Sequence, residues 1–334
     1  MIQAKGFALV LVLWVLSLLT IMAGSFALSM RREAAIVTGL SHNAQATAVA
    51  ESGLAVAELM LLNPDQQQRW RTDGSIYQID YTDAQVRIRL VAETGKIDLN
   101  AADQTLLEGL MTYAPVETEE QTKLVNAILD WRDEDDLVHI DGAEKDEYKK
   151  AGLSYQPRNK PFQSVEELQL VLGMNEQVFN WLENRVTVYS AQPKVDLTQA
   201  TKEVLQVLPG MDGGSIDSYI AARRESAING LPAPVFGVSV ASQPGADTEI
   251  DSTLNTAVND GTIQAGMITV VSDAVLVDGS TANIKALIIK AEGAKSSPFQ
   301  IQKWLHNAVG EGSLFADEKD ELLVRQYGEP EFNN

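Results

Sequence analysis

The sequence contains no cysteine and only three histidines, His42, His139 and His306. The missing thiols exclude disulfide bonds, thiol nucleophiles and thiolate metal ligands, and they are compatible with an oxidising compartment such as the periplasm. Because the three histidines are scattered along the sequence, a histidine-rich zinc site is not expected. The sequence also lacks a nucleophile elbow, a phosphate-binding loop and a dinucleotide-binding fingerprint. We therefore expect that the protein is not an enzyme.

Basic residues are also scarce. The chain of 334 residues has 26 lysines and arginines against 46 aspartates and glutamates, which gives a net charge of −20. A surface that follows the phosphates of nucleic acid needs clustered lysine and arginine, so we expect no nucleic-acid partner. Hydrophobic residues make up 45% of the chain, and the length is sufficient for two or three domains with real cores.

The longest stretch without a charge runs from Phe7 to Leu28. As a helix, this stretch would be roughly 33 Å long, enough to cross the hydrocarbon core of a bilayer. Lys5 precedes the stretch and Arg31-Arg32 follow it, so a count of positive charges alone favours a cytoplasmic location for the residues that follow. A secretory signal peptide that is cleaved near Ala27 is an alternative interpretation.

The Lys5-Gly6-Phe7 junction resembles the leader of type IV prepilins. In that family a peptidase cleaves after the glycine, on the cytoplasmic side, and methylates the new N-terminal phenylalanine, so the resemblance implies processing at Gly6 and Phe7. It also places the rest of the chain in the periplasm, and we prefer it to the charge count because the leader is more specific. Pilin-like subunits usually carry glutamate at the fifth mature position, where this chain has Leu11. A subunit without that carboxylate suits the end of a filament.

Residues 29–63 contain no proline, and their apolar or small residues recur near helical spacing. We predict one helix from Phe7 to about Leu62 that ends at Asn63-Pro64. Residues 76–92 alternate between apolar and polar side chains around a turn at Thr82-Asp83, which predicts a β-hairpin. A long helix followed by antiparallel strands is the order found in pilins.

Residues 96–231 show mostly helical periods, with residues 186–189 as a single strand candidate. Two similar segments in this block form a weak internal repeat. Asn100 and Thr198 begin these segments and are expected to be helix N-caps. Ser164 to Glu167 is expected to form a capping box that opens another helix.

One copy of the repeat, which contains the turn Leu208-Pro209-Gly210-Met211, resembles a helix-hairpin-helix unit of DNA-binding proteins. In those units the glycine turn presents backbone N–H groups to phosphate, and basic residues flank it. Here Asp212 follows the turn, and the whole block is acidic. We therefore interpret the unit as a packing scaffold.

Strands return in the last third of the chain. Residues 234–266 are rich in glycine, serine, aspartate, asparagine and threonine and are expected to form a long surface loop. Residues 268–277, 282–291 and 299–305 are strand candidates. The acidic tail, residues 311–334, is expected to be mobile.

This order of elements predicts an α+β fold in which a long N-terminal helix packs on an antiparallel sheet and a large all-α domain is inserted between strands. The expected parts are the leader (1–6), the transmembrane part of the long helix (7–28), the first part of a pilin-like domain (29–95), the inserted helical domain (96–232), the second part of the pilin-like domain (233–310) and the acidic tail (311–334).

A dense group of carboxylates lies between Asp130 and Glu147. If this loop folds back on itself, its like charges repel, and a hard divalent cation with six to eight oxygen ligands would relieve the repulsion. The spacing differs from that of an EF-hand. One alternative is a solvated acidic loop without an ion. Another is a metal-dependent hydrolase, which the lack of an obvious histidine or lysine partner disfavours.

The whole chain resembles the K-type minor pseudopilins of the bacterial type II secretion system. The resemblance rests on the Gly6-Phe7 leader, Leu11, the inserted helical block and the segments Lys96 to Asn100, Asp130 to Asp136 and Gln163 to Leu168. It implies a non-enzymatic subunit that caps the pseudopilus tip and promotes fibre assembly and protein export across the outer membrane. The alternative function is that of a membrane-anchored helix-hairpin-helix DNA-binding protein of the competence type.

The same resemblance implies partners, a location and a cofactor. The partners are other minor pseudopilins of the I, J and H types, the major pseudopilin and the prepilin peptidase. The location is the inner membrane, crossed once, with the globular part in the periplasm. K-type pseudopilins are thought to bind calcium in the inserted block, so the acidic loop is the expected calcium site. The expected ligands are Asp133, Asp135, Asp136, Asp141, Glu144 and Asp146.

Overall fold

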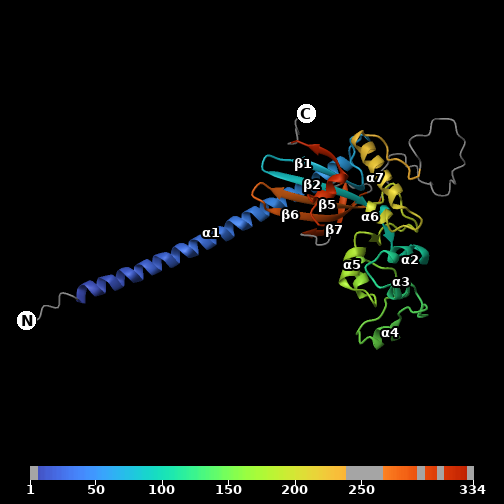
Figure 1. Ribbon diagram of the computed structural model, residues 1–334, viewed down its shortest axis with the longest axis horizontal. Helices are drawn as coiled ribbons and strands as arrows, with labels where there is room; N and C mark the ends of the chain where they lie inside the picture. Colours follow the sequence, from blue (N-terminus) through green and yellow to red (C-terminus); the bar gives the residue numbers. More distant parts are fainter. Residues whose placement is uncertain (1–6, 238–265, 292–297, 307–311, 329–334) are drawn as a thin grey trace, which may run out of the picture.

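Helix α1 runs without a break from Phe7 to Leu61 and forms a rod that projects from the folded part of the molecule (Figure 1). The computed structural model describes residues 7–237, 266–291, 298–306 and 312–328. Within these residues, α1 is the one helix that is long and apolar enough to cross a membrane, and the most apolar part of it is not covered by the rest of the chain. The predicted helix from Phe7 to about Leu62 is confirmed.

The C-terminal part of α1 packs against a sheet. Its buried residues recur every three or four positions and are Ala46, Ala50, Leu54, Ala57 and Leu61. Gly53 lies on the same side of the helix, and a Cβ atom at this position would collide with Ser272 Oγ. The small residues therefore allow the helix to lie close to the strands beneath it.

The sheet has six strands in the order β7-β6-β5-β2-β1-β8. The strands are β1 (Asp73–Asp80), β2 (Ala84–Ala92), β5 (Met267–Leu276), β6 (Thr281–Lys290), β7 (Phe299–His306) and β8 (Leu323–Tyr327). Neighbours are antiparallel except β1 and β8, which run parallel. The predicted hairpin and the three predicted C-terminal strands are confirmed.

The two central strands, β2 and β5, are distant in sequence. Their register places Ala92 opposite Ile268 and Ala84 opposite Leu276, so everything between these strands forms an insertion into one sheet. The insertion lies beside the sheet and forms a separate lobe (Figure 1). Its described elements are η1 (Glu93–Gly95), β3 (Ile97–Asp98), α2 (Gln104–Thr112), α3 (Thr118–Arg132), α4 (Lys145–Lys150), η2 (Val165–Leu170), α5 (Glu176–Leu182), β4 (Val186–Thr187), α6 (Lys202–Leu205) and α7 (Gly213–Ile228).

The lobe and the sheet have separate hydrophobic cores. The core of the lobe includes Trp131, Tyr148 and Phe162, whereas the core of the sheet is closed by α1. The short strands β3 and β4 pair in parallel within the lobe, so the predicted strand at residues 186–189 exists but is shorter than expected. The predicted α+β fold with an inserted helical domain is therefore confirmed.

The predicted N-caps at Asn100 and Thr198 are wrong, because both residues belong to turns that precede the helices. Asp98 accepts hydrogen bonds from the backbone N–H groups of Asn100 and Ala101, and Asp196 accepts from the N–H of Thr198. Helix α2 instead begins after Asp103, whose side chain accepts from the N–H of Leu106 at 2.8 Å, and α6 begins after Thr201. An aspartate turn before each helix is the feature that the two repeat copies share.

The predicted capping box at residues 164–167 is also wrong. Ser164 makes no capping bond with its side chain, and the segment forms the 3₁₀-helix η2. Glu167 forms an ion pair with Arg158 at 2.7 Å and accepts from the N–H of Gln163 at 3.1 Å. Both contacts use Oε1, while Oε2 has no hydrogen-bond partner, so the carboxylate does not complete a capping box with Ser164.

The C-terminal region corrects a further prediction, because residues 312–328 are built into the sheet. Residues 317–322 form η4 (Asp317–Leu322), and β8 then pairs with β1 at the edge of the sheet. Leu314 is fully buried, and Arg87 of β2 donates to its carbonyl at 2.9 Å. The prediction of a mobile tail is therefore wrong for residues 312–328. The expected loop at 234–266 lies mostly outside the described residues.

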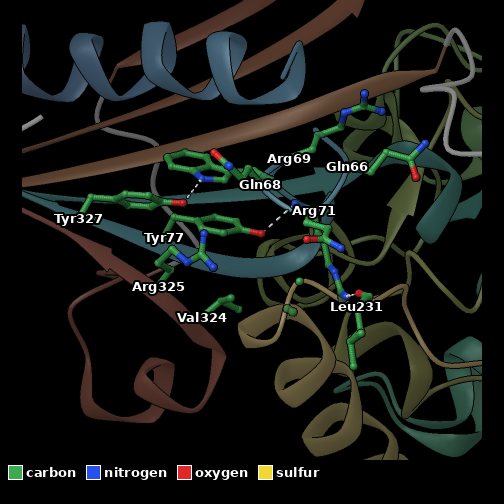
Figure 2. Close-up of a pocket in the computed structure, with 13 residues that line it drawn as sticks. Gln66, Gln68, Arg69, Arg71, Tyr77, Leu231, Val324, Arg325 and Tyr327 are labelled. Carbon is green, nitrogen blue, oxygen red and sulfur yellow. Dashed lines mark hydrogen bonds between the residues drawn. The ribbon is translucent and has the colours of Figure 1, made fainter. Parts of the chain in front are cut away.

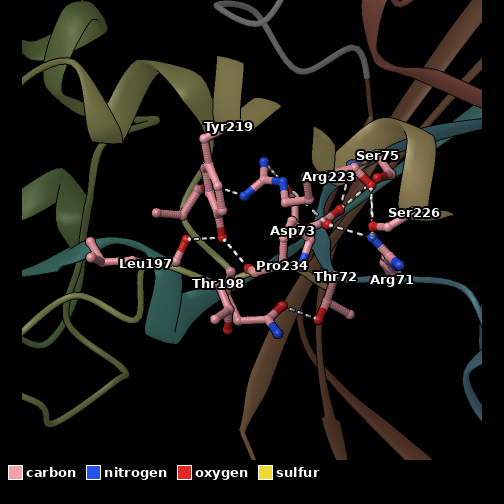
Figure 3. A network of polar contacts seen from close by, with 12 residues as sticks. Arg71, Thr72, Asp73, Ser75, Leu197, Thr198, Tyr219, Arg223, Ser226 and Pro234 are labelled. Atoms are coloured by element: carbon pink, nitrogen blue, oxygen red, sulfur yellow. Dashed lines mark hydrogen bonds and ion pairs between the residues drawn. The ribbon is translucent and has the colours of Figure 1, made fainter. Parts of the chain in front are cut away.

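A buried polar network joins the lobe to the sheet (Figure 3). Arg223 of α7 donates to the carbonyl of Asp73 at 2.8 Å, and its Nε lies 3.4 Å from the Asp73 carboxylate. Arg71 in turn donates to the carbonyl of Arg223 at 2.9 Å and to Ser226 Oγ at 3.0 Å. Because Arg223 and Asp73 are almost fully buried, the network fixes the position of α7 against β1.

Candidate metal centre

The acidic loop lies between α3 and α4, at the end of the lobe that is far from the sheet (Figure 1). Helix α3 ends at Arg132, whose guanidinium donates to the carbonyls of Leu99 and Ala102. Arg132 therefore points its charge toward the start of the lobe. Between Arg132 and Lys145 the sequence offers no lysine or arginine to neutralise the loop.

Asp130, in the last turn of α3, organises the loop. Its side chain is fully buried; Oδ1 accepts from the N–H of His139 at 3.1 Å and Oδ2 accepts from the N–H of Ala143 at 2.6 Å. The imidazole Nδ1 of His139 also contacts Oδ1. Gly142 lies against the same carboxylate, and a Cβ atom there would collide with Asp130 Oδ2. The loop thus folds around one buried carboxylate.

Glu144 is a second buried carboxylate in this region, and it lacks a partner. The residue is 5% exposed, and neither side-chain oxygen has a hydrogen-bond donor. Burial, together with the negative charges of Asp130, Asp133 and the neighbouring aspartates, raises the pKa of Glu144 to about 7. Asp133 is similar in kind, because burial and the charges of Asp135 and Asp130 raise its pKa and its Oδ1 has no donor.

These orphaned oxygens fit a hard cation. Ligand atoms of Asp130, Asp133 and His139 lie within 4.8 Å of one another. Buried carboxylates without donors are costly, and a divalent ion would satisfy them and cancel their repulsion. The donor set is dominated by carboxylate oxygens, which is the chemistry that calcium prefers. The residues present therefore fit the calcium ion that the sequence predicts.

The six expected ligands fall into three groups. Asp133 and Glu144 contribute orphaned oxygens to the buried cluster. Asp135 and Asp136 are exposed on the loop, and their charges act on Glu144. Asp135 Oδ1 accepts from the N–H of Leu137 at 2.8 Å, and Asp136 Oδ1 accepts from Asn159 Nδ2 at 2.9 Å.

The third group consists of Asp141 and Asp146, which are exposed. Asp141 interacts electrostatically with Lys123, and Asp146 interacts electrostatically with Lys150. The structure gives neither residue a contact with the buried cluster. The central residue, Asp130, was not among the expected ligands. Its position in an otherwise apolar stretch of α3, directly before Trp131, is a sign of burial that the sequence already contains.

Comparisons with known proteins relate this lobe to one family. A family model described as "Type II secretion system (T2SS), protein K" matches residues 88–191, which include the acidic loop. The type II secretion system protein K of Klebsiella pneumoniae is 29% identical over 200 residues. In this part of the chain the sequence is similar to the type II secretion system protein K family. The match with the Klebsiella relative covers 54% of this chain and 61% of that protein, less than two thirds of its length.

A solved structure shows the same fold as this chain. It is a chain of the GspK-GspI-GspJ complex from the type 2 secretion system of enterotoxigenic Escherichia coli. The TM-score is 0.50 at 15% identity, and the match covers 81% of this chain and 99% of that chain. At this identity the likeness shows the fold and nothing further.

The turn that resembles a helix-hairpin-helix unit lies between α6 and α7. Gly210 adopts a positive φ of 77°, as a tight turn of this kind requires. Asp212 then caps α7, and its side chain accepts from the N–H of Ser215 at 3.1 Å. A carboxylate thus occupies the helix end where a phosphate would bind, which argues against a DNA-binding use of the turn.

A small cleft lies beside the junction between lobe and sheet (Figure 2). Trp70 stacks on Tyr77 with ring centroids 4.3 Å apart, and its indole N–H donates to the Tyr327 hydroxyl at 2.9 Å. The Tyr77 hydroxyl accepts from the backbone N–H of Arg71 at 2.8 Å. Because these polar groups bind one another, the cleft connects β1, β8 and the lobe and carries no ligand chemistry of its own.

Proposed function

We propose that the chain is a minor pseudopilin that caps the tip of the type II secretion pseudopilus. In this role it promotes fibre assembly and thereby protein export across the outer membrane. The observation that carries the proposal is the bulky lobe inserted between β2 and β5. The sheet that contains these strands packs on a helix long enough to cross a membrane. The role is structural rather than enzymatic.

The shape of the molecule supports a terminal position. Subunits of a pilus-like fibre stack through their long helices, as in other helical bundles. Here the lobe lies at the end of the molecule opposite to the projecting part of α1 (Figure 1). A further subunit stacked at that end would collide with the lobe, so the fibre would stop there.

Leu11 supports the same position. It is exposed on the apolar part of α1, at the fifth place after Gly6, where pilin-like subunits carry glutamate. Without that carboxylate, the helix has no partner for the terminal amine of a neighbouring subunit. It also buries no unpaired charge in the bilayer.

We further propose that the partners include minor pseudopilins of the I and J types, often with the H type, together with the major pseudopilin. The similarity to the protein K family and the fold shared with a chain of the GspK-GspI-GspJ complex support the first two. Sedimentation of the purified chain with purified I-type and J-type subunits tests this proposal. A stable three-component complex is expected, and separate sedimentation of the three proteins would contradict it.

We propose that α1 anchors the chain in the inner membrane, with the sheet and the lobe in the periplasm, and that prepilin peptidase processes it at Gly6 and Phe7. Phe7 is the first residue of α1, whereas Gly6 lies outside the described residues. Mass spectrometry of the membrane-extracted protein tests this. A chain that begins at methylated Phe7 is expected, and a chain that begins near residue 28 would remove the basis of the proposal.

Finally, we propose that the acidic loop binds calcium through Asp133 and Glu144, with Asp130 at the centre of the cluster. The support is the buried carboxylate of Glu144, neither of whose oxygens has a hydrogen-bond donor, beside the half-buried Asp133, whose Oδ1 also lacks one. The other expected ligands are Asp135, Asp136, Asp141 and Asp146. Of these, Asp135 and Asp136 are the two whose negative charges help to raise the pKa of Glu144. Calcium should raise the melting temperature of the protein and EDTA should lower it, while no shift in either direction would exclude the ion.

A further inference from the structure

The acidic loop carries an exposed apolar segment that its proposed role in calcium binding does not use. Leu137, Val138 and Ile140 are exposed to 76%, 51% and 86%. Single exposed apolar residues are common on protein surfaces, but three large ones within four positions form a patch. This patch, residues 137–140, lies at the end of the lobe away from the sheet (Figure 1).

The backbone of the patch is held in place. The N–H of Leu137 donates to Asp135 Oδ1 at 2.8 Å, and Asn126 Nδ2 donates to the carbonyl of Ile140 at 2.7 Å. The N–H of His139 donates to Asp130, and the N–H of Gly142 donates to the carbonyl of His139 at 2.8 Å. The polar groups of the backbone are thus bound to the lobe while the apolar side chains remain in solvent. Such an arrangement presents the side chains at a fixed place.

The patch is flanked by negative charge. Glu134, Asp135, Asp136 and Asp141 are all exposed within four residues of it. A surface that covers the patch must therefore supply apolar contact at its centre and positive charge at its rim. Anionic lipid headgroups and a second copy of the same loop both carry the wrong charge.

We propose that residues 137–140 are a docking surface for a partner protein whose own surface has an apolar centre bordered by lysine and arginine. The proposal deepens the function proposed above and rests on it in one respect, because a cation at Glu144 and Asp133 would fix the loop that presents the patch. Leu137 and Ile140 are the apolar anchors, and Glu134, the flanking carboxylate that is not among the expected calcium ligands, selects the charge of the partner.

The test uses the full chain in nanodiscs of zwitterionic lipid and two fluorescent amphipathic peptides of equal length, one built from leucine and lysine and one from leucine and glutamate. Fluorescence anisotropy at physiological salt and with calcium should show binding of the leucine-lysine peptide alone. The double variant Leu137→Ser/Ile140→Ser should weaken this binding by about tenfold or more, because two apolar contacts are lost. Glu134→Lys should weaken it by about threefold.

The control is Val277→Ser, which changes another exposed apolar residue, 82% exposed in the turn between β5 and β6, and should have no effect. Equal binding of both peptides, or equal effects of the control and the double variant, overturns the proposal. So does self-association in sedimentation, or binding to phosphatidylglycerol vesicles, that the double variant abolishes. Loop-dependent peptide binding that EDTA leaves unchanged supports the docking surface and contradicts the calcium proposal, so the two failures are distinguishable.

Discussion

At the scale of single residues, the least expected group in the molecule is the carboxylate of Glu144. It is buried, lacks a hydrogen-bond donor and has a pKa raised to about 7 by burial and by neighbouring carboxylates. In Glu144→Gln the buried charge is gone, so the metal-free variant should be at least as stable as the parent. The calcium-dependent rise in melting temperature should shrink by about 5 °C or more, as loss of a tightly bound ion implies.

A matched variant separates this effect from a general loss of negative charge. Glu119→Gln removes an exposed carboxylate in the first turn of α3 that is not among the expected ligands. Its calcium-dependent melting shift should equal that of the parent. Differential scanning calorimetry with calcium and with EDTA measures both variants. An equal loss of the calcium effect in the two variants would contradict the central place of Glu144.

A second residue-scale prediction concerns pH. Asp273 of β5 is buried, and burial raises its pKa although Ser313 Oγ and the N–H of Leu314 donate to it. Because the folded pKa exceeds the unfolded value, this group contributes stability below about pH 4 that is lost as the pH rises through the folded pKa. Asp273→Asn keeps an acceptor oxygen without the charge. The stability of this variant relative to the parent should therefore increase between pH 4 and pH 7.

Urea denaturation at the two pH values measures this change, which should amount to about 1 kcal/mol. Asp278→Asn is the control, because hydrogen bonds from Ser280 lower the pKa of Asp278. That group favours the folded state above its unfolded pKa, so the control variant should lose relative stability over the same interval. A parallel trend in both variants would show that burial does not govern Asp273.

The residue scale also shows where reasoning from the sequence stops. The carboxylate-rich loop was evident, but which carboxylate is buried depends on how the loop closes on Asp130 through His139 and Ala143. The N-caps were misplaced because aspartate turns delay the start of both α2 and α6 by three residues. Local hydrogen-bonding preferences alone do not decide between an aspartate turn and a cap.

At the scale of elements, the contact between α1 and β5 depends on Gly53. Gly53→Ala places a methyl group against Ser272 Oγ and should lower the free energy of unfolding by about 1–3 kcal/mol. Gly39→Ala is the control in the same helix, because no atom lies within 4 Å of a Cβ at that position. It should raise the stability by up to about 1 kcal/mol through helix propensity.

Chemical denaturation of the full chain measures both substitutions. The double variant Gly53→Ala/Ser272→Ala should recover most of the loss, because it removes the oxygen atom with which the new methyl group collides. A destabilised Gly53→Ala variant without recovery would place the strain in the helix rather than at the sheet. An equal effect of Gly39→Ala and Gly53→Ala would exclude the close contact altogether.

The elements differ in how well periodicity predicts them. Helix α1 and strands β1, β2, β5, β6 and β7 were expected, because the spacing of apolar residues along each of them follows the period of its secondary structure. Strand β8 was missed, since five residues after an acidic run carry little pattern and form a strand only because β1 offers an open edge. Strands β3 and β4 are two residues long each and are separated by most of the sequence of the lobe. No local sequence signal indicates that they pair.

At the scale of the whole molecule, the insertion explains why two kinds of pattern coexist in one chain. The strands on either side of the lobe pair with each other, and the lobe has its own core. The order strand, helix, strand along the sequence therefore predicted the insertion. The polar junction through Arg223 and Asp73 was not predictable from the sequence, because the two residues are 150 positions apart. They meet only when the folded lobe packs against the folded sheet.

Removal of the lobe tests this modular architecture. Ala92 and Ile268 face each other in adjacent strands, so deletion of residues 96–265 leaves a short hairpin loop between β2 and β5. The shortened chain should keep the sheet and α1 but unfold at lower denaturant concentration. The reason is that Arg89 loses its partner Glu203, and that Asp73 loses Arg223 and keeps only Arg71 at 3.9 Å as a charged partner, both in a buried region. Circular dichroism with chemical denaturation checks this outcome, and loss of all cooperative unfolding would contradict it.

The same deletion tests the proposed role in the fibre. If the lobe stops growth because a further subunit collides with it, a chain without residues 96–265 should no longer mark the end of the pseudopilus. Fibres assembled in its presence should be longer than those formed with the full chain, as electron microscopy of sheared fibres would show. Glu144→Gln, which keeps the lobe, is the control and should leave the lengths unchanged. Equal lengths with and without the lobe would mean that its bulk does not end the fibre. The substitution of leucine for glutamate at position 11 would then be the remaining structural reason for a terminal position.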